Sequence, residues 1–193
     1  MIKHISFFFI VTSFSFYIHR SSTLNHRFLS LHSKTRKYIH YIDNTCLYTK
    51  TPLIQKHIKP LYFTIEHIIP QSYLKSINEK KTCFYDLHLI YKCLPSVNSF
   101  RSNKPYTDEI TTNTSFFYVC NNSTKGIIAR ACLYYLHTYK PKNRKLFYSK
   151  VLSRKLIHKW NTLYPVSSYE IYRHDIIVSL QNKTNPYIIK NIS

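Results

Sequence analysis

Two stretches rich in aromatic and β-branched residues precede Pro95. This order restricts the fold more than any other feature of the chain. The first is LYFTI at residues 61–65, which has the composition of a β-strand. The second begins at Tyr85 and leads to Pro95, which opens a short helical turn. That turn carries Asn98 and Arg101 three residues apart, and therefore on one helix face. The pattern predicts two strands followed by a short helix.

Helices are expected around this unit. A short helix is predicted at residues 72–79, between the two strands. Three longer helices are predicted at residues 125–139, 145–160 and 165–181, the last of which begins with a capping box. A chain of 193 residues is long enough for one domain with a leader segment. We therefore expect an α+β fold in a single domain.

Basic residues greatly outnumber acidic ones. Lys and Arg total 28 and Asp and Glu total 8, which gives a formal net charge of +20. A chain this basic typically binds a polyanion, which is nucleic acid, an anionic membrane surface or an acidic polysaccharide. An AT-rich gene would also enrich Lys, but it does not explain why Asp and Glu are scarce, because their codons are not GC-rich. Nucleic acid is therefore the first expected partner.

The first twenty residues have the features of a targeting segment. A basic start is followed by an apolar stretch at residues 5–18, which is shorter than the ~20 residues of a membrane span. We expect residues 1–20 to be a signal peptide and the protein to be secreted. An uncleaved anchor or a buried N-terminal element are the alternatives. The 5 cysteines include no C-x-x-C, which argues against a zinc site, and one or two disulfides are expected after secretion.

The adjacent pair Glu66-His67 is the main candidate for chemistry. Alone, such a pair is usually a surface carboxylate beside a hydrogen-bonded histidine. Here it belongs to an ordered series of segments: IEHIIPQS, DLHLI, PSVNSFRSNKPY, KGIIARACLYYL and WNTLYPVSSYE. This series, within about residues 60–188, resembles the endonuclease I family of secreted and periplasmic nucleases, whose catalytic core is a ββα-metal motif.

The resemblance implies a role for each matched residue. His67 matches the general base, Glu66 and Asn98 match the metal ligands, and Arg101 matches an arginine that we place near the phosphate. The implied cofactor is Mg²⁺, with Mn²⁺ or Ca²⁺ as substitutes, and the implied partner is DNA, with RNA as a further substrate. The implied products carry 5′-phosphates. These residue types suit that chemistry, because a neutral imidazole accepts a proton near pH 7 and Mg²⁺ prefers oxygen ligands.

On this interpretation residues 1–20 are the signal peptide, residues 21–60 are a basic lead-in to the same domain, and residues 61–193 are the catalytic region of an expected monomer. Asp86, His88 and Arg130 are expected to hold the structure together rather than to act in catalysis.

The chain also departs from the family pattern, at Phe84, Leu89, Ser99, Ser102 and Asn182-Lys183. Leu89 replaces an asparagine and Phe84 replaces an acid that some members have. Ser99, Ser102 and Asn182 stand where glycines are common. These departures leave two alternatives open, an inactive nucleic-acid-binding relative and a cationic secreted or membrane-surface protein.

Overall fold

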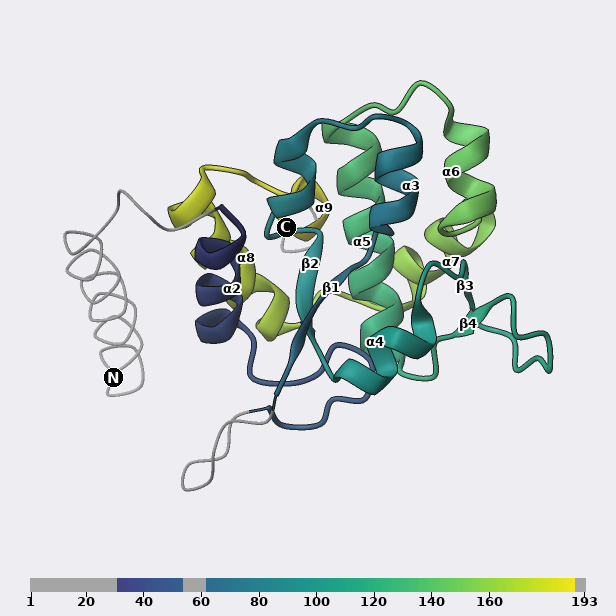
Figure 1. Cartoon of the computed structure of the whole chain (residues 1–193), viewed down its shortest axis with the longest axis horizontal. Coiled ribbons are helices and arrows are strands. Elements are labelled where there is room, and N and C mark those ends of the chain that lie inside the picture. The colour runs from purple at the N-terminus through teal and green to yellow at the C-terminus, as the bar shows by residue number, and fades with distance from the viewer. Residues whose placement is uncertain (1–30, 54–61, 190–193) are drawn as a thin grey trace. The chain divides into compact units, whose positions relative to one another are not determined.

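The computed structural model describes residues 31–53 and 62–189 (Figure 1). The signal peptide predicted at residues 1–20 lies outside these residues. The contacts divide the chain into Met1–Lys34 and Thr35–Ser193, and the account below concerns the second unit and the first residues of helix α2. The structure combines helices with two small sheets, which confirms the predicted α+β class.

A ββα unit lies at the centre of the predicted catalytic region (Figure 1). Strand β1, Thr64–His67, pairs antiparallel with strand β2, Ile90–Cys93. Helix α4, Pro95–Arg101, follows β2 almost at once. Pro95 stands in the first turn of α4, where the missing N–H has no intrahelical partner to lose. The predicted order of strand, strand and short helix is confirmed.

The first strand lies further along the chain than predicted. Its ladder runs from the pair Thr64 and Cys93 to the pair His67 and Ile90. Composition favoured residues 61–65, but the partner strand fixes which residues form ladder hydrogen bonds. As a result Glu66 and His67 are themselves strand residues.

Two helical segments differ most from their predicted bounds. Helix α3, Gln71–Ser76, ends before residue 79 because the chain turns at Asn78, where φ is 51°. The predicted helix at 145–160 is two helices, α6 (Arg144–Lys150) and α7 (Arg154–Leu163). Ser153 separates them, because its side chain accepts a hydrogen bond from the Leu156 N–H and so caps a new helix.

The remaining elements complete the fold. They are α2 (Leu31–Ile42), the 3₁₀ helix η1 (Lys81–Tyr85), β3 (Tyr106–Thr107), β4 (Phe117–Tyr118), α5 (Asn122–Thr138), α8 (Ser168–Gln181) and α9 (Pro186–Ile189). Strands β3 and β4 form a second, parallel pair. Helix α8 begins with the predicted capping box of Ser167 and Glu170. Helix α5 is buried along most of its length and packs against α7 and α9.

Arg130 fixes helix α5 to the first turn of α8 and to the chain before it. Its guanidinium contacts both carboxylate oxygens of Glu170, at 2.7 and 2.8 Å, and donates to the Tyr164 carbonyl at 2.8 Å. Gly126 makes room for this contact, because a Cβ at that position would lie 2.5 Å from Arg130 Nη2. The structural role predicted for Arg130 is confirmed.

Asp86 and His88 connect the loop before β2 to the C-terminal part of the chain. The Asp86 carboxylate accepts hydrogen bonds from the Tyr134 and Tyr139 hydroxyls, at 2.9 and 2.7 Å, and pairs with Lys183 at 2.7 Å. His88 Nε2 donates to the Lys183 carbonyl at 2.9 Å. Both side chains are almost completely buried, as expected for structural residues.

Candidate active site

A pocket of about 340 Å³ lies where β1 meets α4. It is lined by Ile65, Glu66, His67, Pro70, Gln71, Ser72, Asn98, Arg101, Ser102 and Asn103. All four residues that the sequence singled out for chemistry are among them. Residues 66–67 and residues 98–101 are therefore brought together by the antiparallel pairing of β1 with β2 and the turn into α4.

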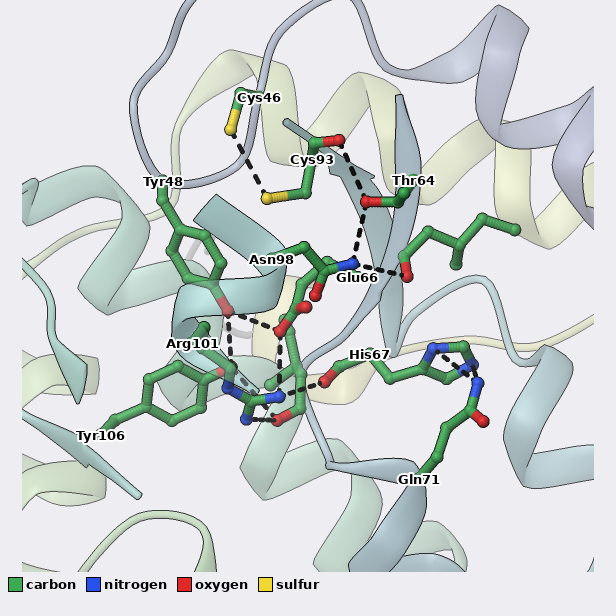
Figure 2. A network of polar contacts seen from close by, with 12 residues as sticks. Cys46, Tyr48, Thr64, Glu66, His67, Gln71, Cys93, Asn98, Arg101 and Tyr106 are labelled. Carbon is green, nitrogen blue, oxygen red and sulfur yellow. Dashed lines mark hydrogen bonds and ion pairs between the residues drawn. The ribbon is translucent and has the colours of Figure 1, made fainter. Parts of the chain in front are cut away.

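Glu66 lies in the buried wall of this pocket. It is the buried residue of β1, whereas its neighbour His67 is half-buried, because adjacent strand residues point to opposite faces. The carboxylate oxygen Oε1 accepts a hydrogen bond from the Tyr48 hydroxyl at 2.6 Å and lies 3.0 Å from Arg101 Nη1 (Figure 2). Burial raises the pKa of Glu66, and Arg101 and Tyr48 act in the opposite direction.

His67 is held in one tautomer by the backbone. Its Nε2 lies 3.0 Å from the Phe84 carbonyl oxygen. A carbonyl only accepts, so Nε2 carries the proton and Nδ1 is the acceptor nitrogen of the neutral ring. The amide nitrogen of Gln71 lies 3.2 Å from Nδ1 and also 3.2 Å from Nε2 (Figure 2). The Nδ1 edge of the ring therefore meets a polar group of the pocket.

The amide of Asn98 is oriented by β1. Its Nδ2 donates to the Thr64 hydroxyl at 2.9 Å and to the Ile65 carbonyl at 3.2 Å. Both protons of the amide nitrogen are thereby used on the strand. The amide oxygen is the remaining polar atom of this side chain, and Asn98 belongs to the lining of the pocket.

Arg101 is buried beneath the pocket. Only 1% of the residue is exposed. Besides the Glu66 contact, its guanidinium donates to the carbonyls of His67 and Ile68, at 2.9 and 2.8 Å. It also lies 4.6 Å from the centre of the Tyr106 ring. Arg101 thus fixes both the carboxylate of Glu66 and the backbone of His67, and its role in contacting phosphate stays a prediction.

A comparison with known protein families tests the family resemblance that these residues indicated. Residues 14–191 match the family model described as Endonuclease I. The chain belongs to the endonuclease I family. No curated protein matches it. The family assignment makes the protein a nuclease, a hydrolase that acts on nucleic acid.

Two departures from the endonuclease I pattern have a clear place in the structure. Phe84 lacks the acid that some members have, but its backbone carbonyl holds His67 in this chain. Leu89, which stands in place of an asparagine, is buried in the hydrophobic core. The polar support of His67 therefore comes from the main chain rather than from either of these side chains.

The donor set fits the divalent cation that the endonuclease I resemblance implies. Glu66 and Asn98 line one pocket, and their carboxylate and amide groups carry hard oxygen donors. In the described part of the chain no group of three or more His, Cys, Asp or Glu residues is placed to hold a metal. A site with two protein oxygens suits Mg²⁺, which usually keeps several water ligands.

The residues that support this endonuclease I site were not visible in the sequence. Tyr48 and Tyr106 share a hydroxyl contact of 2.9 Å beside Glu66, and Tyr106 also donates to the Ile68 carbonyl. Thr64 anchors Asn98 across 34 residues of sequence. Contacts of this kind join distant segments, and only Thr64 had a local signal, because it precedes Glu66 in the predicted strand region.

Proposed function

We propose that this protein is a metal-dependent endonuclease that hydrolyses phosphodiester bonds of DNA, and also of RNA, with little sequence preference. One observation carries the proposal. A histidine with a fixed tautomer lies in the same pocket as a buried carboxylate and an oriented amide oxygen. This combination supplies a proton acceptor beside oxygen donors for a cation, which phosphodiester hydrolysis requires.

His67 is the general base in this proposal. Its Nε2–H donates to the Phe84 carbonyl, so Nδ1 is the nitrogen that would take a proton from water. The water takes the place of the Gln71 amide nitrogen, which lies 3.2 Å from Nδ1. Holding the ring by a backbone carbonyl supports this role because the carbonyl fixes both the tautomer and the orientation.

Glu66 and Asn98 are the residues that would hold Mg²⁺, with Mn²⁺ or Ca²⁺ as substitutes. The bound ion would supply charge stabilisation at the phosphate and at the leaving 3′ oxygen, which leaves the phosphate on the 5′ end of the product. Arg101 is a positioning residue in this proposal. Its guanidinium holds Glu66 Oε1 and the His67 carbonyl, and because Arg101 also lines the pocket we place it near the phosphate.

The charge of the chain supports nucleic acid as the substrate. A net charge of +20 favours contacts with phosphates, which give affinity without reading base sequence. Secretion, with removal of residues 1–20, is part of the proposal and rests on the apolar stretch at residues 5–18. In the described residues no helix is long and apolar enough to cross a membrane.

Cleavage of supercoiled plasmid tests the proposal directly. We expect nicked and then linear DNA with Mg²⁺, no cleavage with a chelator, and recovery when Mg²⁺ or Mn²⁺ is restored. The products should be substrates for a ligase without prior phosphorylation, because they carry 5′-phosphates. Retarded but intact plasmid under every metal condition would instead identify a binding protein that has lost catalysis.

A further inference from the structure

Two buried cysteines meet beside the candidate site. The Sγ atoms of Cys46 and Cys93 are 3.7 Å apart, and neither residue is exposed (Figure 2). The backbone holds the two segments together, because the Leu47 N–H donates to the Lys92 carbonyl at 3.0 Å. The Leu94 N–H also approaches Cys46 Sγ at 3.5 Å. Contacts between the residues next to each cysteine therefore hold the two segments, and with them the two sulfurs, together.

This arrangement is close to the geometry of a cross-link. A disulfide needs sulfurs about 2 Å apart on residues whose Cβ atoms are about 4 Å apart. The two sulfurs are in contact at 3.7 Å, so bond formation requires them to approach by roughly 1.7 Å. We propose that Cys46 and Cys93 form a disulfide that joins the segment after α2 to the end of β2. All 5 cysteines are free thiols in the structure, and in this proposal the other three, Cys83, Cys120 and Cys132, remain so.

The other cysteines do not offer an equivalent pair. In the described part of the chain, which includes all 5 cysteines, only Cys46 and Cys93 have their sulfurs in contact. Cys83 and Cys132 are buried elsewhere in the core, and Cys120 is exposed. The geometry thus selects one pairing from those that the sequence left open.

The oxidant is a low-molecular-weight disulfide, such as oxidised glutathione. The Cys46 thiolate attacks one sulfur of the oxidant and releases one thiolate. Cys93 then loses its proton, and its sulfur attacks the Cys46 sulfur and releases the second thiolate. The two protein thiols are oxidised and the oxidant is reduced to two thiols. Since both sulfurs are buried, the exchange takes place as the chain folds.

The bridge stabilises the turn from β2 into helix α4, the helix that carries Asn98. Cys93 is the last residue of β2, and helix α4 begins two residues later. The Cys93 carbonyl accepts a hydrogen bond from the Thr64 hydroxyl at 3.4 Å, and the same hydroxyl accepts from Asn98 Nδ2 at 2.9 Å. A covalent hold on Cys93 therefore restrains the contacts that orient the Asn98 amide. This consequence for metal binding rests on the proposed function, whereas the cross-link itself does not.

Thiol counting tests the cross-link without any assay of activity. The full chain is folded in a glutathione redox buffer, unfolded in guanidinium and alkylated, with and without prior reduction. We expect three alkylated cysteines without reduction and five after it, and a peptide pair joined through Cys46 and Cys93 in the digest. Five reactive thiols in the unreduced sample, or a bridge that involves a different cysteine, would overturn the proposal.

Matched variants test what the cross-link does for stability. Oxidation should raise the Tm of the parent by roughly 5 to 15 °C, because the bridge closes a loop between residues 47 positions apart. The double variant Cys46→Ser, Cys93→Ser should show no difference between oxidising and reducing conditions. Cys83→Ser, which removes another buried thiol, should keep the difference. If the oxidised and the reduced parent have the same Tm, the bridge does not stabilise the fold. If the double variant does not fold, the thiol count of the parent still decides the pairing.

An activity measurement separates this proposal from the proposed function. If the protein cleaves DNA, its reduced form should need roughly tenfold more Mg²⁺ for half-maximal cleavage, because the support of Asn98 is loosened. An unchanged Mg²⁺ requirement would remove the link to Asn98 and leave the cross-link standing. Absence of cleavage in both forms would count against the proposed function, while the thiol count and the Tm difference would still report on the bridge.

Discussion

Arg101 and Glu66 form an ion pair beneath the pocket, with 3.0 Å between Nη1 and Oε1 and about 2% of each side chain exposed. The pair joins helix α4 to strand β1, and the two elements carry Asn98 and His67 respectively. Burying two charges is unfavourable unless each is well paired. The Tyr48 hydroxyl and the carbonyls of His67 and Ile68 provide the further hydrogen bonds that such a pair needs.

Removing Arg101 should therefore destabilise the whole domain. We expect Arg101→Leu to lower the free energy of unfolding by about 3 to 5 kcal/mol, because Glu66 is left as an unpaired buried charge. Adding Glu66→Gln should recover part of that loss. Urea unfolding of the single and double variants measures both effects.

The exposed pair of Lys159 and Asp108 provides the comparison. Its Nζ and Oδ2 atoms are 2.7 Å apart, but 46% of the lysine side chain is exposed. Lys159→Leu should change stability far less than Arg101→Leu. Equal losses from the two substitutions would mean that burial does not determine the cost of breaking the Glu66 pair.

His67→Ala should abolish cleavage while DNA binding remains. A general base typically contributes about 10²- to 10⁴-fold to the rate, so we expect at least a hundredfold loss. One neutral imidazole contributes little to binding by a chain of net charge +20, so DNA affinity measured in chelator should stay close to that of the parent. His158→Ala, an exposed histidine on α7, is the control and should cleave normally. A folded His67→Ala protein that nicks plasmid at the parent's rate would show that another residue is the base.

Asn98 and Thr64 should affect the metal requirement to different degrees. Asn98→Ala removes a proposed ligand and should remove cleavage or raise the Mg²⁺ concentration needed. Thr64→Val keeps both proposed ligands but removes the hydroxyl that holds Asn98 Nδ2, so it should raise that concentration by roughly tenfold. Titration of plasmid cleavage with Mg²⁺ ranks the two variants. Full activity of Asn98→Ala at low Mg²⁺ would exclude Asn98 from the site.

Ser99 and Ser102 stand where the family commonly has glycine, and replacing each with glycine should change the stability of the domain in opposite directions. Ser102 has φ 51° and ψ −122°, a conformation that favours glycine, whereas Ser99 lies inside helix α4. Ser102→Gly should stabilise the domain by about 1 kcal/mol because it relieves backbone strain. Ser99→Gly should destabilise it by about 0.5 to 1 kcal/mol. Thermal unfolding of both variants provides the measurement, and the idea of strain at Ser102 fails if both glycines destabilise.

Stability should fall as the pH drops from about 6.5 to about 4 because of His88. Burial lowers the pKa of His88 from 6.5 to about 4 in the folded protein. The unfolded chain therefore binds a proton that the folded chain does not, so this contribution is fully present above pH 6.5 and is lost as the pH falls toward 4. The loss attributable to His88 is about 3 kcal/mol. Urea unfolding across this range should show a shallower pH dependence for His88→Gln, and identical profiles would mean that other groups cause the decline.

The sequence by itself determined the central elements and the residues of interest. Aromatic and β-branched composition predicted strands on either side of the first short helix, and Pro95 predicted where the next short helix begins. The capping box before α8 appears as predicted, since it depends on residues only three positions apart. The ordered segments around Glu66-His67 and Asn98 identified the family, which the match over residues 14–191 confirms.

Only the tertiary structure decided how these residues are supported. The β1 register with β2 extended the strand through His67, and the fold brought Tyr48 and Thr64 against Glu66 and Asn98. The fold also places the backbone carbonyl of Phe84 against His67, at a position where some family members have an acid. Every residue has a backbone carbonyl, so the sequence does not reveal which one makes this contact. Short-range signals such as helix caps and strand composition depend only on residues that are neighbours in sequence. Apart from the contact of Gln71 with His67, the polar contacts that hold this site join residues 17 to 58 positions apart, and their partners become known only when the chain is folded.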